Sequence, residues 1–288
     1  MARSKRFLVG IRMLDSKVET FYHAHPEIPN QERAREILEQ LYKIEKGYKT
    51  PTEIGIEVEI EKCIKLAGLK IFHQEDDGSL KDAGIEFISI PIKDDNVLYA
   101  LEELEYIYNK NPKSVFSHRC SIHVHINVSK LTVGQLHALI ATYLATENFF
   151  FSLVAPERRG NSFCYPLADL CITKEDIAPE NIDEKFKYAA LNPHHLVDFG
   201  TLEFRHHHGT KNKKELLNWI ETILQLYRYV KKVPPLEIYS TIRELNTISN
   251  YYEFLKDVFE GKLQLFNVGL NFGKVLRNNI TTAKIFLG

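Results

Sequence analysis

The chain has 288 residues, 44% of them hydrophobic and 26% charged, which is typical of globular protein with one large domain or two small ones. Its 37 basic and 38 acidic residues nearly balance, so no global field favours nucleic acid or an anionic membrane surface. The absence of a signal-peptide h-region and of a membrane-length apolar run, with four cysteines and no CxxC spacing, predicts a cytoplasmic protein with reduced thiols.

The first half of the chain predicts strands separated by two helices. After an apolar run, FLVGIRML, a helix is expected at 31–46 because apolar residues recur there at i, i+3 and i+4. Strands are expected at IGIEVEIEK, at 69–73, at 85–92 and at CSIHVHINV, with the loop HQEDDGSLKDAG between the second and third and a helix at 96–108 between the last two.

The second half predicts more helix. A long, buried helix is expected at 132–154, a polar loop region at 156–196, a strand within GTLEFRHHHGT and an amphipathic helix at 213–231. The last fifty residues are predicted to be helical and then irregular. Strands alternating with long connections and helices indicate an α+β sheet covered on one face.

Alternation along these strands separates charged from apolar side chains, because residues i and i+2 share a face. Four strands each carry acids, imidazoles or an arginine on one face and mostly apolar side chains on the other. The polar sets are Glu57, Glu59 and Glu61; Glu86; His123 and His125; and Glu203, Arg205 and His207. Taken singly, each set is also explained by a solvated strand face or a cross-strand ion pair. If the strands share a sheet, the polar faces converge.

A sheet face with several carboxylates, imidazoles and an arginine suits Mg²⁺ and substrate phosphates, which indicates phosphoryl transfer. The sequence contains no HExxH helix, Walker A loop, GxGxxG after a first strand or kinase motif set. GLNFGK, at 269–274, has only a weak similarity to a phosphate-binding loop and is expected to form a turn.

Five segments occur along the chain in an order that is found in a known family: GIEVEIE, the EDDGSL loop leading into GIEFISIP, CSIHVHIN, ERRGNSFCYPL and GTLEFRHHHGT. Together they resemble the amidoligases of the glutamine-synthetase-like superfamily, which also contains the glutamate-cysteine ligases. The resemblance implies a curved, mainly antiparallel sheet with a concave active-site face and helices packed on the other face. It implies a catalytic core at 50–235, flanked by an N-terminal extension at 1–49 and a mostly helical extension at 236–288.

The resemblance also implies an activity and its site. ATP would phosphorylate a carboxylate and an amine would attack the acyl phosphate, with two or three Mg²⁺ or Mn²⁺ ions present. The implied metal ligands are Glu57, Glu59, Glu86, His123 and Glu203, with Asp77 or Glu75 as a further candidate. The implied ATP contacts are His125, Arg205, Arg159 and Asn161, and the implied catalytic residues are Arg205, Glu203 and Arg158. Two departures are Ser121, where many relatives have glycine, and the imidazole-rich run 206–208.

Two other functions fit the same residues: a kinase for a guanidino or carboxylate substrate, and a relative that binds nucleotide or metal without catalysis. The expected partners are a small-molecule or peptide carboxylate and an amine, with no membrane and no nucleic acid expected. The identity of both substrates, the general base for the amine and the oligomeric state are left open by the sequence.

Overall fold

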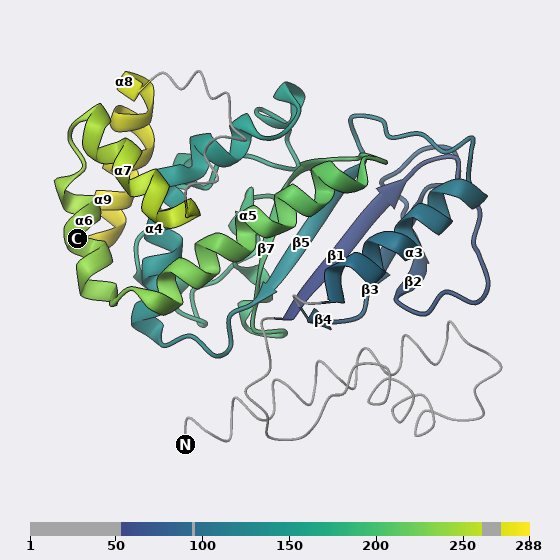
Figure 1. Cartoon of the computed structure of the whole chain (residues 1–288), viewed down its shortest axis with the longest axis horizontal. Coiled ribbons are helices and arrows are strands. Elements are labelled where there is room, and N and C mark those ends of the chain that lie inside the picture. Colours follow the sequence, from purple (N-terminus) through teal and green to yellow (C-terminus); the bar gives the residue numbers. More distant parts are fainter. Residues whose placement is uncertain (1–52, 94–95, 261–271) are drawn as a thin grey trace. The chain divides into compact units, whose positions relative to one another are not determined.

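A computed structural model describes residues 53–93, 96–260 and 272–288 (Figure 1). The expected helix at 31–46, the apolar run before it and the first half of GLNFGK lie outside the described residues. The second half of GLNFGK is helical, in α8 (Phe272–Val275), so the prediction of a turn was wrong there. The chain forms two compact units. Of the described residues, the first unit takes in those up to Ser129 together with His195–Thr201 and His208–Leu217. The second takes in Lys130–His194, Leu202–His207 and the described residues from Asn218 onward. The division at 49 and 235 stays a prediction.

The first unit contains an antiparallel sheet with strands in the order β2, β3, β1, β5, and β4 pairs with the start of β1. The strands are β1 (Glu53–Ile60), β2 (Phe72–Asp76), β3 (Ile85–Ser89), β4 (Ile92–Lys93) and β5 (Ser121–Asn127). The α+β class with a mostly antiparallel sheet is therefore confirmed. The glutamine-synthetase-like curvature stays a prediction.

One face of this sheet is apolar and is covered by helix α3 (Val97–Lys110), which Figure 1 shows lying along β1 and β3. The isoleucines and valine that alternate along β1 and β5 are all at most 2% exposed. The Glu103 carboxylate of α3 accepts hydrogen bonds from the backbone N–H groups of 70–72, just before and at the start of β2. Burying one face of the sheet fixes which side chains point to the other.

The second unit is mainly helical and centres on α4 (Val133–Ser152), whose side chains are buried on nearly all sides. Thr132 and Gln135 form a capping box that starts this helix. The other helices are α6 (Pro235–Glu244), α7 (Ile248–Phe259), α8 (Phe272–Val275), the π-turn η8 (Leu276–Ile280) and α9 (Thr281–Leu287).

Two elements contribute residues to both units: strand β7 (Thr201–His208) and helix α5 (Lys213–Lys232). Within the second unit, the short strand β6 (Leu191–Asn192) pairs antiparallel with β7. The remaining turns are η2 (Pro156–Arg158), η3 (Leu167–Leu170), η4 (Glu175–Ile177), η5 (Glu184–Phe186) and η6 (His194–Leu196).

The structure differs from the sequence prediction at several points. The short strand β6 lies within the region 156–196, which was expected to be loop. Strand β2 begins three residues later than expected, because antiparallel pairing with β3 places residues 72–76 opposite 85–89. The expected strand 85–92 is divided at Pro91, which lacks the N–H that a continuous ladder needs. Residues 272–287 are helical, so the prediction of an irregular chain end was wrong there. Among the described residues, no helix is both long and apolar enough to cross a bilayer.

Candidate functional site

Strand register places three carboxylates in one row across the polar face of the first unit's sheet. Glu59 of β1 pairs with Glu86 of β3, and Glu86 pairs with Glu75 of β2. Directly opposed side chains on neighbouring strands have Cβ atoms only about 5 Å apart. Like charges at that spacing repel one another, so the row favours a bound cation.

Glu86, the middle carboxyl group of this row, has a strongly raised pKa. Burial raises the pKa of its carboxyl group, and the carboxylates of Glu57, Glu59, Asp77 and Glu75 raise it further, to about 9 against an ordinary value of 4.5. Without a cation, Glu86 therefore keeps its proton at neutral pH. Asp77 and Glu75 lie near enough to Glu86 to raise its pKa. A residue that completes a metal site with Glu86 must lie this near.

Glu57 lies in a second row, opposite His123 of β5. Its Oε2 is 3.4 Å from His123 Nδ1, and its Oε1 is 3.1 Å from His125 Nε2. Burial raises the pKa of Glu57, but the two imidazoles together outweigh burial and hold that pKa well below its ordinary value. Glu57 is therefore a permanent carboxylate between two histidines.

Ser121 controls the orientation of His123. Its hydroxyl donates to Glu59 Oε2 at 2.7 Å and lies 2.8 Å from His123 Nε2. Because the only hydroxyl proton goes to Glu59, the serine oxygen accepts a hydrogen bond from Nε2–H of the imidazole. Nδ1 of His123 faces Glu57 Oε2 at 3.4 Å, and a metal ion would bind Nδ1 in its unprotonated form while Nε2–H keeps its bond to Ser121.

Glu57, Glu86 and His123 fit a divalent cation. Each offers one ligand atom, and these three atoms lie within 4.8 Å of one another. Carboxylate oxygens with one imidazole suit Mg²⁺ or Mn²⁺. Burial first, and then four neighbouring carboxylates, raise the pKa of Glu86, and a cation bound here would offset the repulsion among these acids.

A pocket of about 210 Å³ opens on the same face, beside Glu57. Its polar walls include Glu53, Glu75, His125 and Asn127, and its apolar walls include Ile88 and Pro91. The rings of His195 and Phe199 also line it, with centroids 5.5 Å apart. The pocket therefore lies beside the candidate cation site, because Glu57 belongs to both. Its partly aromatic walls suit a flat ligand group such as a nucleotide base.

The predicted residues of β7 lie in the second unit. Glu203 is 1% exposed and is held by Asn192 Nδ2 at 2.7 Å and by the Arg205 guanidinium. That guanidinium also lies over the ring of Tyr188, 6.0 Å from its centroid. The paired acid and base are therefore fixed in orientation before any substrate binds.

Arg158 is buried, with only 1% of its surface exposed. Its guanidinium donates to the backbone carbonyl oxygens of Arg205 and His206, at 2.6 and 3.0 Å. In this position Arg158 supports β7 from within the unit. Direct contact of Arg158 with a substrate stays a prediction that its burial disfavours.

A buried polar chain continues from β7 into α4. His206 Nε2 lies 2.7 Å from the hydroxyl of Tyr143, which donates to Glu147 at 2.9 Å. Glu147 also accepts from the N–H groups of Leu167 and Ala168. Burial raises the pKa of Glu147 to about 7 and is also the main reason that the pKa of His206 lies well below its ordinary value. The chain ties together β7, α4 and η3.

The other two loop residues are more accessible. Arg159 is exposed and donates to the Asn148 carbonyl oxygen at 3.3 Å, and Asn161 Oδ1 accepts from the N–H of Phe163 at 2.8 Å. Five predicted residues, Glu57, Glu59, Glu86, His123 and His125, are brought together in the first unit. Arg158, Arg159, Asn161, Glu203 and Arg205 belong to the second, so their joining that cluster stays a prediction.

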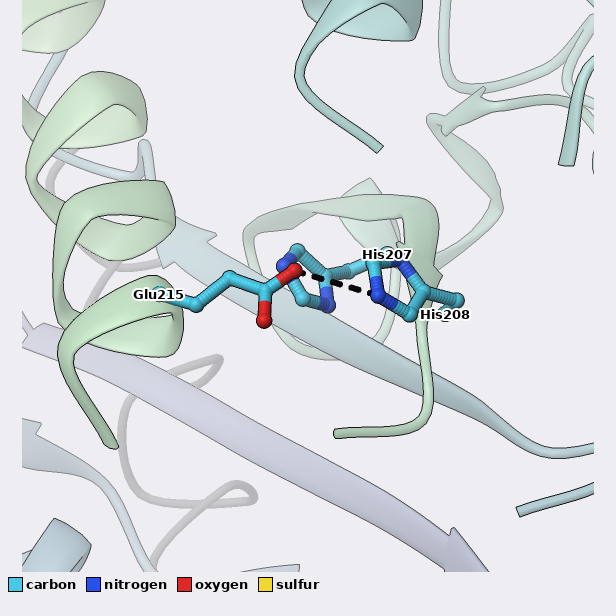
Figure 2. A group of neighbouring side chains, drawn as sticks. All are labelled: His207, His208 and Glu215. Carbon is cyan, nitrogen blue, oxygen red and sulfur yellow. Dashed lines mark ion pairs between the residues drawn. The ribbon is translucent and has the colours of Figure 1, made fainter. Parts of the chain in front are cut away.

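The imidazole-rich run of β7 is divided among different neighbours. His206 contacts Tyr143 as above, and the ring of His207 lies 5.4 Å from that of Trp219. His208 Nε2 is 3.1 Å from a Glu215 oxygen at the start of α5, the ion pair dashed in Figure 2. Thr210 also donates to Glu215, so this pair stabilises the turn between β7 and α5.

Several residues of the hydrogen-bond networks and of the pocket were not among the residues predicted from the sequence. Glu147 had a usable signal, since a single acid within an apolar helix must find buried partners. Ser121 was noted only as a departure from related sequences. Glu53, His195 and Phe199 had no local signal, because only the folded chain brings their segments to one pocket.

A family model described as "Putative amidoligase enzyme" matches residues 31–227, which include β1 to β7. No curated protein matches the chain.

Proposed function

The chain belongs to the amidoligase family, and on that premise we propose that it is an ATP-dependent ligase joining a carboxylate to an amine through an acyl phosphate. One observation carries the proposal: Glu57, Glu86 and His123 converge within 4.8 Å, beside a pocket of about 210 Å³. A divalent cation there, next to a nucleotide pocket, is the arrangement that phosphoryl transfer requires.

In this proposal the pocket takes ATP. The base lies against the rings of His195 and Phe199, and the phosphates extend toward His125 and Glu57. Glu57, Glu59, Glu86, His123 and Glu203 would hold two or three Mg²⁺ or Mn²⁺ ions, with Asp77 or Glu75 in support. Such ions, when bound, would offset the negative charge of the phosphates.

The reaction has two steps. An oxygen of the substrate carboxylate attacks the γ-phosphorus and ADP leaves, and the amine nitrogen then attacks the acyl carbon and inorganic phosphate leaves. Arg205 offsets the charge that develops on the phosphoryl group, and its fixed pairing with Glu203 holds it in place. We assign Arg158 to positioning β7, because its buried guanidinium binds that strand's backbone.

The test uses the full chain with Mg-ATP and mixtures of amino acids, peptides and amines, followed by mass spectrometry. A product lighter than the sum of its acid and amine by one water, formed with ADP, supports ligation. A gain of phosphate without condensation indicates the kinase alternative, and no turnover across the panel, with nucleotide bound, indicates the binding-only alternative.

Two variants sharpen this test. Glu57→Gln should abolish ADP formation, because it removes the carboxylate shared by both histidines. Glu102→Gln is the matched control, since Glu102 is exposed on α3. Once a product is known, an acid labelled with ¹⁸O in its carboxylate must transfer one ¹⁸O to phosphate. Unlabelled phosphate would refute the acyl phosphate.

A further inference from the structure

The pocket has a polar end at the first residue of β1. Glu53 Oε2 accepts a hydrogen bond from Asn127 Nδ2 at 3.0 Å. The Asn127 amide is itself oriented, because its Oδ1 accepts from both the N–H and the hydroxyl of Ser129. Glu53 and Asn127 both line the pocket. The Glu53 carboxylate is therefore held in a defined place at the wall of the cavity.

This carboxylate has acceptor capacity beyond its bond to Asn127. An ionised carboxylate offers about four acceptor positions and no donor. The ligand group that it recognises must therefore be a donor, such as an amino or hydroxyl group. A carbonyl oxygen in the same position would face the carboxylate oxygens and be repelled.

Strand geometry indicates which part of a nucleotide reaches Glu53. Glu53 and Glu57 are four residues apart on β1, or about 13 Å at the rise of a strand. Gly55, midway between them, has no side chain, and a Cβ there would lie 3.4 Å from the Cβ of His125. With the phosphates at Glu57, an extended nucleotide passes over Gly55 with its ribose, and the edge of its base arrives at Glu53.

We propose that Glu53 recognises the 6-amino group of adenine and so makes the pocket select ATP over 6-oxopurine nucleotides. The proposal rests on the proposed function, since it takes the pocket to be the nucleotide site. The pocket walls that would contact the base include the rings of His195 and Phe199 and the apolar side chains of Ile88 and Pro91. These walls give affinity to any purine, so discrimination falls to Glu53 and to Asn127, which orients it.

The experiment compares the dissociation constants of ATP and of ITP, in which an oxygen replaces the 6-amino group, by calorimetry on the full chain with Mn²⁺. A hydrogen bond to a charged group predicts that the wild type binds ATP roughly 10- to 100-fold more tightly. Glu53→Gln should bring the two constants close together, because the glutamine amide can accept from an amino group or donate to a carbonyl. Glu102→Gln should keep the wild-type preference.

Three results would overturn the inference. Equal binding of ATP and ITP by the wild type would refute recognition at position 6 and leave the nucleotide pocket intact, and it needs no variant. A preference that survives Glu53→Gln would assign discrimination to another group. If neither nucleotide binds, the proposed function fails together with the inference.

Discussion

Replacing Glu86 by glutamine should make the metal-free protein more stable, although it removes a residue expected to be functional. The carboxyl group of Glu86 has a pKa raised to about 9, by burial and by four neighbouring carboxylates. Glutamine has nearly the same shape and cannot ionise. The substitution therefore removes the free-energy cost of holding Glu86 protonated at neutral pH while it keeps the packing.

The sign and size of the effect follow from proton linkage. The unfolded chain loses this proton near pH 4.5, whereas the folded chain holds it until about pH 9. Between these pH values the folded state binds more protons, so stability falls as the pH rises. One pKa unit corresponds to about 1.4 kcal/mol, so the loss at pH 7 approaches roughly 3 kcal/mol.

The assay is urea unfolding at pH 5, 7 and 8.5 with EDTA present. The free energy of unfolding of Glu86→Gln should exceed that of the wild type by an amount that grows with pH, and Glu102→Gln should follow the wild type. Saturating Mn²⁺ should then stabilise the wild type, by about 2.7 kcal/mol at 100 times its dissociation constant, and have little effect on Glu86→Gln. A variant less stable than the wild type at pH 7 in EDTA, or equal stabilisation of both by Mn²⁺, would refute the cation site.

Three further substitutions test neighbouring parts of the structure. Ser121→Ala should weaken Mn²⁺ binding about 10- to 100-fold by releasing the His123 tautomer, and unchanged calorimetry would contradict this. Tyr143→Phe should lower the free energy of unfolding by about 1–3 kcal/mol, because it removes the hydroxyl between two buried groups; urea unfolding equal to the wild type would show that the hydroxyl is dispensable. Gly55→Val should greatly reduce ATP affinity by filling the pocket beside His125 while melting stays cooperative, and normal ATP binding would place the nucleotide elsewhere.

Alternation of side chains was sufficient to predict the polar face of each strand. Ile56 and Val58 are fully buried, whereas Glu57 between them faces the candidate site, as expected from a period of two residues. The same rule failed to give the start of β2. Nothing in residues 69–76 specifies the pairing partner, and the ladder with β3 fixes which five of them form the strand.

In the candidate site, too, the sequence determined the direction of each side chain, and strand register determined its neighbours. The sequence by itself determined that Glu57, Glu59, Glu86, His123 and His125 stand on polar strand faces, because the backbone imposes that alternation locally. It could not determine their neighbours. The opposition of Glu86 to Glu59 and Glu75, and the contact of Ser121 with His123, depend on register between segments distant in the chain.

The pocket and the pKa values were decided by the tertiary structure alone. Burial and the fields of neighbouring groups give two glutamates of the same sheet opposite behaviour. Glu57 stays ionised between two histidines, and Glu86 is protonated beside four acids. Both effects depend on distances of a few ångströms between strands, and local sequence carries no information about such distances.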